Sequence, residues 1–183
     1  MPPDRPTSRS APVPGEWTER YGRDLTPLLL FGSGHVGRAL VLALAPLPFR
    51  VSWLDSRENA FPPHIPANAT PIRLRDPDEA IASAPSGAFV LVMTHEHPLD
   101  LAITAAALAR QDLPFVGLIG SASKRARFEK RFREIGIPLE RIAGLVCPIG
   151  VAGIADKDPA VIAAATAAQL LQTREALSSR TSP

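Results

Sequence analysis

The chain of 183 residues has little of what marks several protein classes. It has one cysteine, Cys147, which excludes an internal disulfide and fits a reducing compartment. Aromatic residues make up only 5%, too few for a nucleic-acid stacking surface. No apolar run approaches the roughly 20 residues of a membrane-spanning helix, and the N-terminus lacks the apolar core of a signal peptide. We therefore expect a cytoplasmic protein without a membrane partner.

An excess of charge of one sign is also missing. The 20 Lys and Arg residues face 18 Asp and Glu residues, for a net charge of +2. So small a surplus does not indicate nucleic-acid binding. Hydrophobic residues reach 45% and are mostly aliphatic, a composition that favours helices packed on a sheet. The length suffices for one domain with a substantial core.

Short apolar runs alternate with helical segments along most of the chain. We expect strands at 28–31, 49–54, 71–74, 88–93, 115–119 and 142–146 and helices at 36–44, from 77, 98–110, 121–135 and 159–177. This alternation predicts right-handed β-α-β crossovers. The predicted fold is therefore α/β, a Rossmann-like doubly wound, mostly parallel sheet with helices on both faces.

The predicted domain covers residues 27–177. The Pro-, Ser- and Arg-rich residues 1–26 are expected to form a flexible N-terminal arm, with a short helical turn that carries Trp17 and Tyr21. Residues 178–183 are expected to be a frayed tail. The two aromatic side chains either cap the surface of the domain or dock onto a partner.

A glycine loop joins the first predicted strand to the first predicted helix, the context in which the pattern G-x-G-x-x-G indicates a dinucleotide phosphate site. The first glycine permits the turn, the second lets a pyrophosphate approach the backbone, and the third lets the helix pack close to the strand. Candidate cofactor-binding residues here are Gly32, Ser33, Gly34, His35, Val36 and Gly37.

Asp55 ends the second predicted strand, about 20 residues after the loop, where an acidic side chain accepts hydrogen bonds from ribose hydroxyls. This position favours a ligand without a 2′-phosphate, although Arg57 leaves room for the phosphorylated form. Ser56 lies between them and completes the candidate turn. The alternative is that these residues and the glycines serve only turn geometry.

Three of the four histidines are expected to converge. Thr94, His95 and His97 follow the strand that ends at Met93. In a Rossmann sheet this strand lies next to the first one, so His35 in the glycine loop should be close by. The histidines can contact a cofactor or substrate, satisfy loop backbone groups, or, with Glu96 between His95 and His97, bind a metal. We expect His97 at a helix N-cap.

A second anion-binding signal follows the strand at 115–119. Gly120 and Ser121 begin a helix, and Lys124 lies one turn on, an arrangement suited to a phosphate. The alternative is that the basic residues from Lys124 to Arg133 are simply the solvated face of this helix. Cys147 is expected to be an inert buried thiol, with sulfur handling as the less favoured alternative.

Taken in order, these motifs resemble the C-terminal domain of the XdhC/CoxI family, the accessory proteins of xanthine dehydrogenase and related molybdenum hydroxylases. The resemblance spans about 27–171. Its motifs are GSGHVGRAL (32–40), DSR (55–57), THEHPLD (94–100), FVGLIGSASKRARF (115–128), CPIG (147–150) and DPAVIAAATAAQLL (158–171).

The resemblance implies an accessory or maturation factor for a molybdenum-cofactor enzyme rather than an enzyme. Such a protein would bind NAD or a molybdopterin-type cofactor and assist its insertion. It also implies a molybdenum-containing dehydrogenase and a cysteine desulfurase as partners, and a homo-oligomer.

Full-length family members carry a further N-terminal domain, with a glycine-rich stretch and a cysteine before an acidic residue, and nothing here matches it. We therefore expect this chain to bind only a nucleotide or to act with a partner that supplies the rest. From the residues alone, two alternatives remain. One is an NAD-dependent oxidoreductase with His95 or His97 as acid/base, and the other is a nucleotide-sensing binding module.

Overall fold

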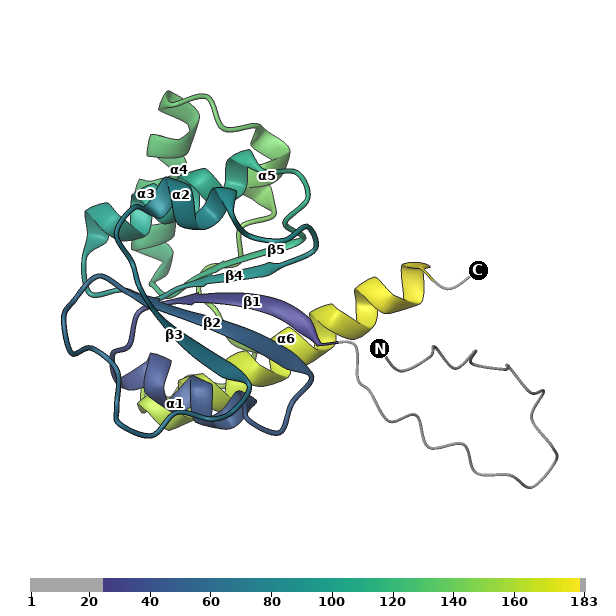
Figure 1. Cartoon of the computed structure of the whole chain (residues 1–183). Helices are drawn as coiled ribbons and strands as arrows, with labels where there is room; N and C mark the ends of the chain where they lie inside the picture. Colours follow the sequence, from purple (N-terminus) through teal and green to yellow (C-terminus); the bar gives the residue numbers. More distant parts are fainter. Residues whose placement is uncertain (1–24, 182–183) are drawn as a thin grey trace, which may run out of the picture.

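The computed structural model describes residues 25–181, so the first 24 residues, with Trp17 and Tyr21, lie outside the description. The described part is a five-stranded sheet flanked by helices (Figure 1). Its strands are β1 (Thr26–Phe31), β2 (Phe49–Asp55), β3 (Ala69–Arg73), β4 (Phe89–Val92) and β5 (Phe115–Leu118). Its helices are α1 (His35–Leu44), α2 (Pro77–Ala82), α3 (His97–Ala109), α4 (Ala122–Glu134), α5 (Leu139–Ala143) and α6 (Pro159–Thr181).

The strand order is β3-β2-β1-β4-β5, and every neighbouring pair is parallel. This order confirms the predicted Rossmann-type sheet. The chain runs outward from β1 to β3, then returns to the other side of β1 with β4. The carboxyl ends of β1 and β4 therefore form a topological switch point, where Rossmann-type folds hold ligands.

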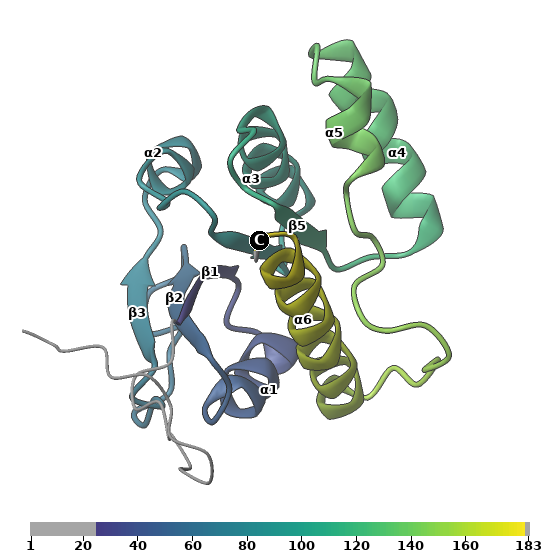
Figure 2. The ribbon, with the colours of Figure 1, turned by 90° about the vertical axis from the view of Figure 1, so that its right-hand side faces the viewer.

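Helices cover both faces of the sheet (Figure 2), so β1, β4 and β5 are almost wholly apolar. On one face, Leu40 and Leu44 of α1 and Leu170 of α6 pack against the sheet. On the other face, α2, α3, α4 and α5 supply a second core that includes Ile103 and Phe132. Among residues 25–181, no helix combines the length and apolarity that a membrane crossing requires.

The outer strand β3 contains a proline that protects the sheet edge. Val51 donates to the Asn68 carbonyl, and Leu74 donates to the Asp55 carbonyl. Backbone groups alternate along a strand, so even-numbered residues between these two bonds face β2 and Pro71 faces outward. Its missing N–H therefore costs no bond within the sheet and removes a donor from the free edge, which opposes pairing with another chain.

Two expectations for the C-terminal part were wrong. The strand expected at 142–146 does not form, because Ile142 and Ala143 belong to the helix α5, which begins after Pro138 and carries Glu140 in its first turn. Only Val146 joins the sheet, where it pairs with Gly117 as an isolated bridge. The helix α6 continues past the end expected at Leu177 and reaches Thr181.

Candidate functional site

The glycine loop lies tightly against the end of β4. Gly32 has φ of +110°, and a Cβ atom there would collide with the carbonyl group of Met93. A Cβ atom on Gly37 would in turn collide with the carbonyl oxygen of Gly32. Both positions therefore require glycine, as the sequence pattern predicted, because β1, the loop and α1 pack backbone to backbone.

Gly34, unlike Gly32 and Gly37, is not packed against other backbone atoms. It is the N-cap of α1, no side chain caps the helix, and the first turn contains no acidic residue. A Cβ atom on Gly34 would meet nothing within 4 Å. The amide groups at the start of α1 thus open onto free space, and the helix dipole adds positive potential there. This is a suitable position for an anionic group.

Asp55 is fully engaged within the protein. One carboxylate oxygen accepts from the backbone N–H of Ser33 at 2.7 Å, from its hydroxyl at 2.9 Å and from Arg57 Nη2 at 2.9 Å. The other oxygen accepts from the backbone N–H and the Nε of Arg57 at 2.9 and 3.0 Å. The side chain is only 3% exposed. Asp55 therefore fixes the glycine loop through Ser33 and holds Arg57 in place.

These bonds change the role expected for Asp55 and Ser33. Both were expected to contact a cofactor, but their polar atoms point into the protein, and neither residue lines the cleft described below. A ribose hydroxyl would have to displace Ser33 or Arg57 from the carboxylate. Ser56, which was also a candidate, does not line the cleft either. The reason is the tertiary packing of the loop against the end of β2.

The pKa of Asp55 reflects this network. Burial alone raises the pKa, but the hydrogen bonds from Arg57 and Ser33 outweigh it and hold the pKa well below its usual range. The carboxylate is therefore charged at neutral pH. The Arg57 side chain is 44% exposed and forms part of the wall beside Gly34.

A second buried carboxylate organises the loop after β4. Asp100 is 0% exposed and accepts from the Thr94 backbone N–H at 3.1 Å, from its hydroxyl at 2.7 Å and from Lys124 Nζ at 2.6 Å. Lys124 Nζ also donates to the Ile119 carbonyl at 2.9 Å. Lys124 was expected to meet an anion, but its ammonium group instead neutralises Asp100. This role of Asp100 was not predicted from the sequence.

Two adjoining hollows form a cleft along the carboxyl edge of the sheet, which we call the edge cleft. The first, of about 280 Å³, lies over the glycine loop, and the second, of about 440 Å³, lies between the loop after β4 and the start of α4. Thr94, His95 and Ile119 line both hollows. The edge cleft thus extends from the N-terminus of α1 to the N-terminus of α4.

Most of the predicted site residues line this cleft. The first hollow contains Gly32, Gly34, His35, Val36, Gly37 and Arg57. The second contains His97, Gly120, Ser121 and Lys124. The predicted convergence of His35, His95 and His97 on one edge is therefore observed. Lining residues not foreseen are Met93, Ile119, Ser123, Arg127 and Pro159.

Cationic groups line the edge cleft. Arg127 forms no ion pair within residues 25–181, Arg57 is held by Asp55 through its Nε and Nη2, and each helix that begins there contributes its N-terminus. The exposed Glu96 pairs with His95, whose Nε2 lies 3.1 Å from Glu96 Oε1. Within residues 25–181 no three His, Cys, Asp or Glu side chains are grouped so as to hold a metal ion. The cationic side chains and the helix N-termini of the cleft suit an anion.

The helix caps at this edge differ in part from expectation. Ser121 is the N-cap of α4, as expected, and its hydroxyl accepts from the Lys124 backbone N–H at 3.3 Å. The N-cap of α3, however, is Glu96, and His97 is the first helical residue. Pro98 is the second helical residue and lies in the first turn, where its missing N–H removes no intrahelical hydrogen bond.

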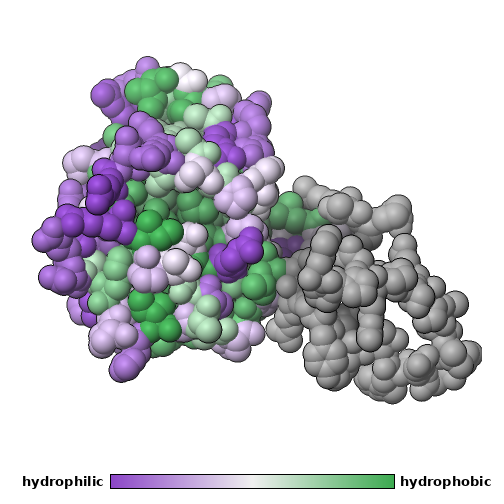
Figure 3. Space-filling view, in the orientation of Figure 1, coloured by the Kyte–Doolittle hydropathy of each residue, from purple (hydrophilic) through white to green (hydrophobic). Residues whose placement is uncertain are grey.

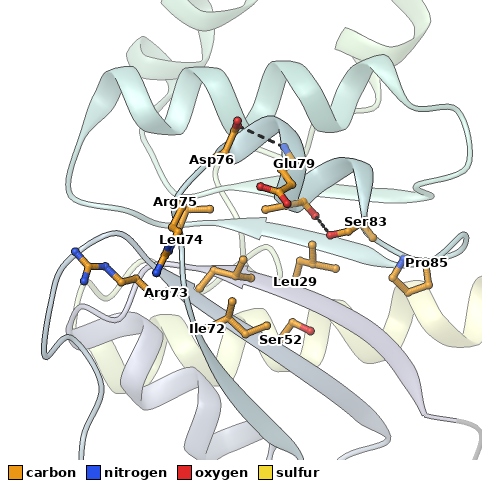
Figure 4. A pocket seen from close by; sticks show the side chains of 13 residues that line it. Leu29, Ser52, Ile72, Arg73, Leu74, Arg75, Asp76, Glu79, Ser83 and Pro85 are labelled. Carbon is orange, nitrogen blue, oxygen red and sulfur yellow. Dashed lines mark hydrogen bonds between the residues drawn. The ribbon is translucent and has the colours of Figure 1, made fainter.

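Another hollow, of about 320 Å³, lies away from this edge, between α2 and the strands β2 and β3 (Figure 4). Apolar surface gathers in the middle of this face in Figure 3. Leu29, Ile72 and Leu74 line the hollow, with Asp76 and Glu79 at the start of α2. None of the predicted site residues lies here. The hollow arises because α2 has only six residues and covers little of the sheet.

Cys147 is buried beside the start of α4, with 4% exposure. Burial raises the pKa of its thiol, although the nearby charges of Lys124 and Arg125 partly oppose this effect. Arg125 also donates to the Cys147 carbonyl at 3.2 Å. A raised pKa keeps the thiol protonated, which agrees with the expected inert thiol.

The fold and the edge cleft define a Rossmann-type domain in which the carboxyl edge of the sheet is open. Residues 28–170 match the family described as the XdhC Rossmann domain, and the chain belongs to that family. The match includes the glycine loop, the loop after β4 and the start of α4.

Two relatives show the same relationship. The uncharacterized protein YqeB of Escherichia coli (strain K12) is 31% identical over 151 residues, which cover 80% of this chain and 27% of YqeB. A crystal structure described as a xanthine dehydrogenase (BH1974) from Bacillus halodurans matches with a TM-score of 0.71 at 26% identity. That match covers 87% of this chain and 45% of the Bacillus chain. The chain therefore spans less than half the length of either relative.

Proposed function

We propose that this protein is an accessory factor for a molybdenum-containing dehydrogenase and that its edge cleft holds the phosphate-bearing cofactor passed to that enzyme. The family and the Bacillus relative support a role beside xanthine dehydrogenase. The observation that carries the ligand chemistry is the open, uncapped N-terminus of α1 at Gly34, flanked by Arg57. Cytoplasmic location, a homo-oligomeric state and a desulfurase partner belong to this proposal.

The residues of the cleft fit an elongated anionic ligand. The amides that follow Gly34 would hold a phosphate or pyrophosphate, with the Arg57 guanidinium beside it. The exposed side chains of His95 and His97 would contact the part of the ligand that extends toward α4. A molybdopterin-type cofactor would supply the redox chemistry after its transfer, whereas this chain would bind, orient and shield it.

A nicotinamide-dependent oxidoreductase is the less favoured alternative. Its cofactor would use the acidic residue at the end of β2 to hold the ribose hydroxyls. Here all strong acceptor positions of Asp55 are taken by Ser33 and Arg57. A sensing module would use the same cleft but would act through changes in assembly, and no contact among residues 25–181 favours that mode of action.

Native mass spectrometry of the protein purified from its own host tests the ligand directly. A co-purifying mass of a molybdopterin-type cofactor is expected for the wild type and should be lost in Gly34→Val, whose side chain enters the open space of the cleft. The matched control is Gly144→Val at the end of α5, where φ is −74° and an added Cβ makes only ordinary contacts. Equal cofactor content in all three proteins, or none in the wild type, would contradict the proposal.

A further inference from the structure

Positive charge is concentrated on α4. The helix carries six Lys and Arg residues against two Glu residues, whereas the whole chain has a surplus of only two positive charges. Four of the cations have acidic partners: Lys124 with Asp100, Arg125 and Arg133 with Glu129, and Arg131 with Glu134. The side chains of Arg127 and Lys130 form no ion pair with any residue in 25–181.

These cations border a groove between α3 and α4. The groove has a volume of about 530 Å³, and Pro98, Leu101 and Phe128 form its apolar floor. Arg127, Lys130, Arg131 and Glu134 lie along its rim. Their spacing of three, one and three residues places them on one face of α4. Figure 2 shows α4 standing at the outer side of the helical layer, separate from α3.

The groove is continuous with the edge cleft, because His97 and Arg127 line both. A protein bound in the groove would therefore stand next to the end of the cleft at α4. Phe128 is 4% exposed, and its ring packs edge-on against Phe132 at 5.9 Å between centroids. Phe128 and Leu101 of the floor thus pack against the core, while the rim cations are exposed. A firm apolar floor with a charged rim is the usual anatomy of a protein-binding site.

We propose that this groove is the docking surface for an acidic amphipathic helix of the partner enzyme. The inference rests on the proposed function, because it assigns the surface by which that enzyme reaches the edge cleft. Acidic side chains would pair with Arg127 and Lys130, which have no partner within the described chain. Apolar side chains at helical spacing would cover Pro98, Leu101 and Phe128. The 13 residues of α4 extend over about 20 Å, which matches two to four turns of a partner helix.

The chemistry of the groove favours a protein over a nucleic acid. An apolar floor offers nothing to a phosphate backbone, and the aromatic ring in it is buried rather than free to stack on a base. Unpaired cations at a rim chiefly accelerate association and make it sensitive to salt. Binding should therefore weaken as the salt concentration rises.

The test uses the full chain and the purified molybdenum-containing dehydrogenase of the same host in a surface binding assay. The double substitution Lys130→Glu and Arg131→Glu reverses the charge of the rim. It leaves the edge cleft unaltered, because neither residue lines that cleft. We expect Kd for the dehydrogenase to rise about tenfold or more. Arg50→Glu combined with Arg75→Glu is the control, since both residues are exposed, lie in the β2–β3 half and give the same change of charge. It should bind within about twofold of the wild type.

Several results would overturn the docking proposal. Equal binding by the rim variant and the control would exclude the groove while leaving the proposed function intact. If sedimentation shows that the wild type and the control form an oligomer and the rim variant does not, the groove would be assigned to a second copy of this chain. Lack of dehydrogenase binding by the wild type would remove both the docking site and the proposed partner. Absence of a co-purifying cofactor from the wild type, by contrast, would contradict the proposed ligand of the edge cleft and would not bear on the groove.

Discussion

The buried pair of Asp100 and Lys124 permits a quantitative prediction. Replacing Lys124 with Met keeps the length of the side chain but leaves the Asp100 carboxylate without a cation. Asp100 is 0% exposed and Lys124 10% exposed, so solvent replaces little of the lost interaction. Removing one partner of such a pair generally costs about 3–5 kcal/mol. Thr94 still donates two hydrogen bonds to Asp100, which places the expected loss near the lower limit, at about 3 kcal/mol.

Urea denaturation of four proteins measures this loss: wild type, Lys124→Met, Asp100→Asn and the double variant. For a domain of this size, a loss of about 3 kcal/mol corresponds to a decrease in Tm of roughly 6–12 °C. The double variant removes both charges. Its loss in the free energy of unfolding should be about 2 kcal/mol smaller than the sum of the losses of the two single variants. A Lys124→Met protein within about 0.5 kcal/mol of wild type, or additive losses, would refute the role assigned to this pair.

Three further predictions concern the glycine loop and its surroundings. The pKa of Asp55 is lowered on folding, so its contribution to stability is present above the ordinary pKa of 3.8 and is lost as the pH falls below it. Denaturation measured from pH 6 to pH 2 should therefore show a smaller decrease in the free energy of unfolding for Asp55→Asn than for the wild type. Gly37→Ala should lower the free energy of unfolding by about 2 kcal/mol or more, because its Cβ collides with the Gly32 carbonyl. Gly34→Ala should change the free energy of unfolding by less than about 1 kcal/mol, because its Cβ meets nothing within 4 Å. Equal losses in the two variants would contradict the packing described. Cys147 should react with a disulfide reagent at pH 8 only after denaturation, and rapid labelling of the folded protein would show that its thiol is not protected.

The sheet was predictable from the sequence because its strands are short apolar runs separated by strong helix signals. Leu28 to Phe31 and Ala88 to Met93 are buried on both faces, so their hydrophobicity is continuous and easily recognised. The segment near Ile142 misled the prediction because one buried residue in a five-residue helix gives no measurable periodicity. Short elements of this kind depend on tertiary packing more than on local preference.

The site was predictable by position and less so by role. Parallel strands bring their carboxyl ends to one edge, so residues after β1, β4 and β5 had to meet there. The sequence did not predict which polar atoms face the cleft, because hydrogen bonds between loops distant in sequence set the orientation of these atoms. Asp55 and Lys124 have the residue types of ligand-binding groups, yet both are satisfied by protein partners. Arg127 looked like one cation among many on a helix face, and only the packing of α4 brings it to the cleft.

The sequence by itself determined the five strands and the helices between them apart from α5, the glycine loop and the family. These depend on local patterns of apolar residues and on glycines whose backbone geometry no other residue can adopt. The tertiary structure alone decided that the two buried carboxylates hold the loops and that the α1 N-terminus remains open. It also decided that the unpaired cations of α4 border a groove beside the cleft. The physical reason is that a charged side chain takes whichever partner the fold brings within hydrogen-bonding distance, and only three-dimensional packing sets that distance.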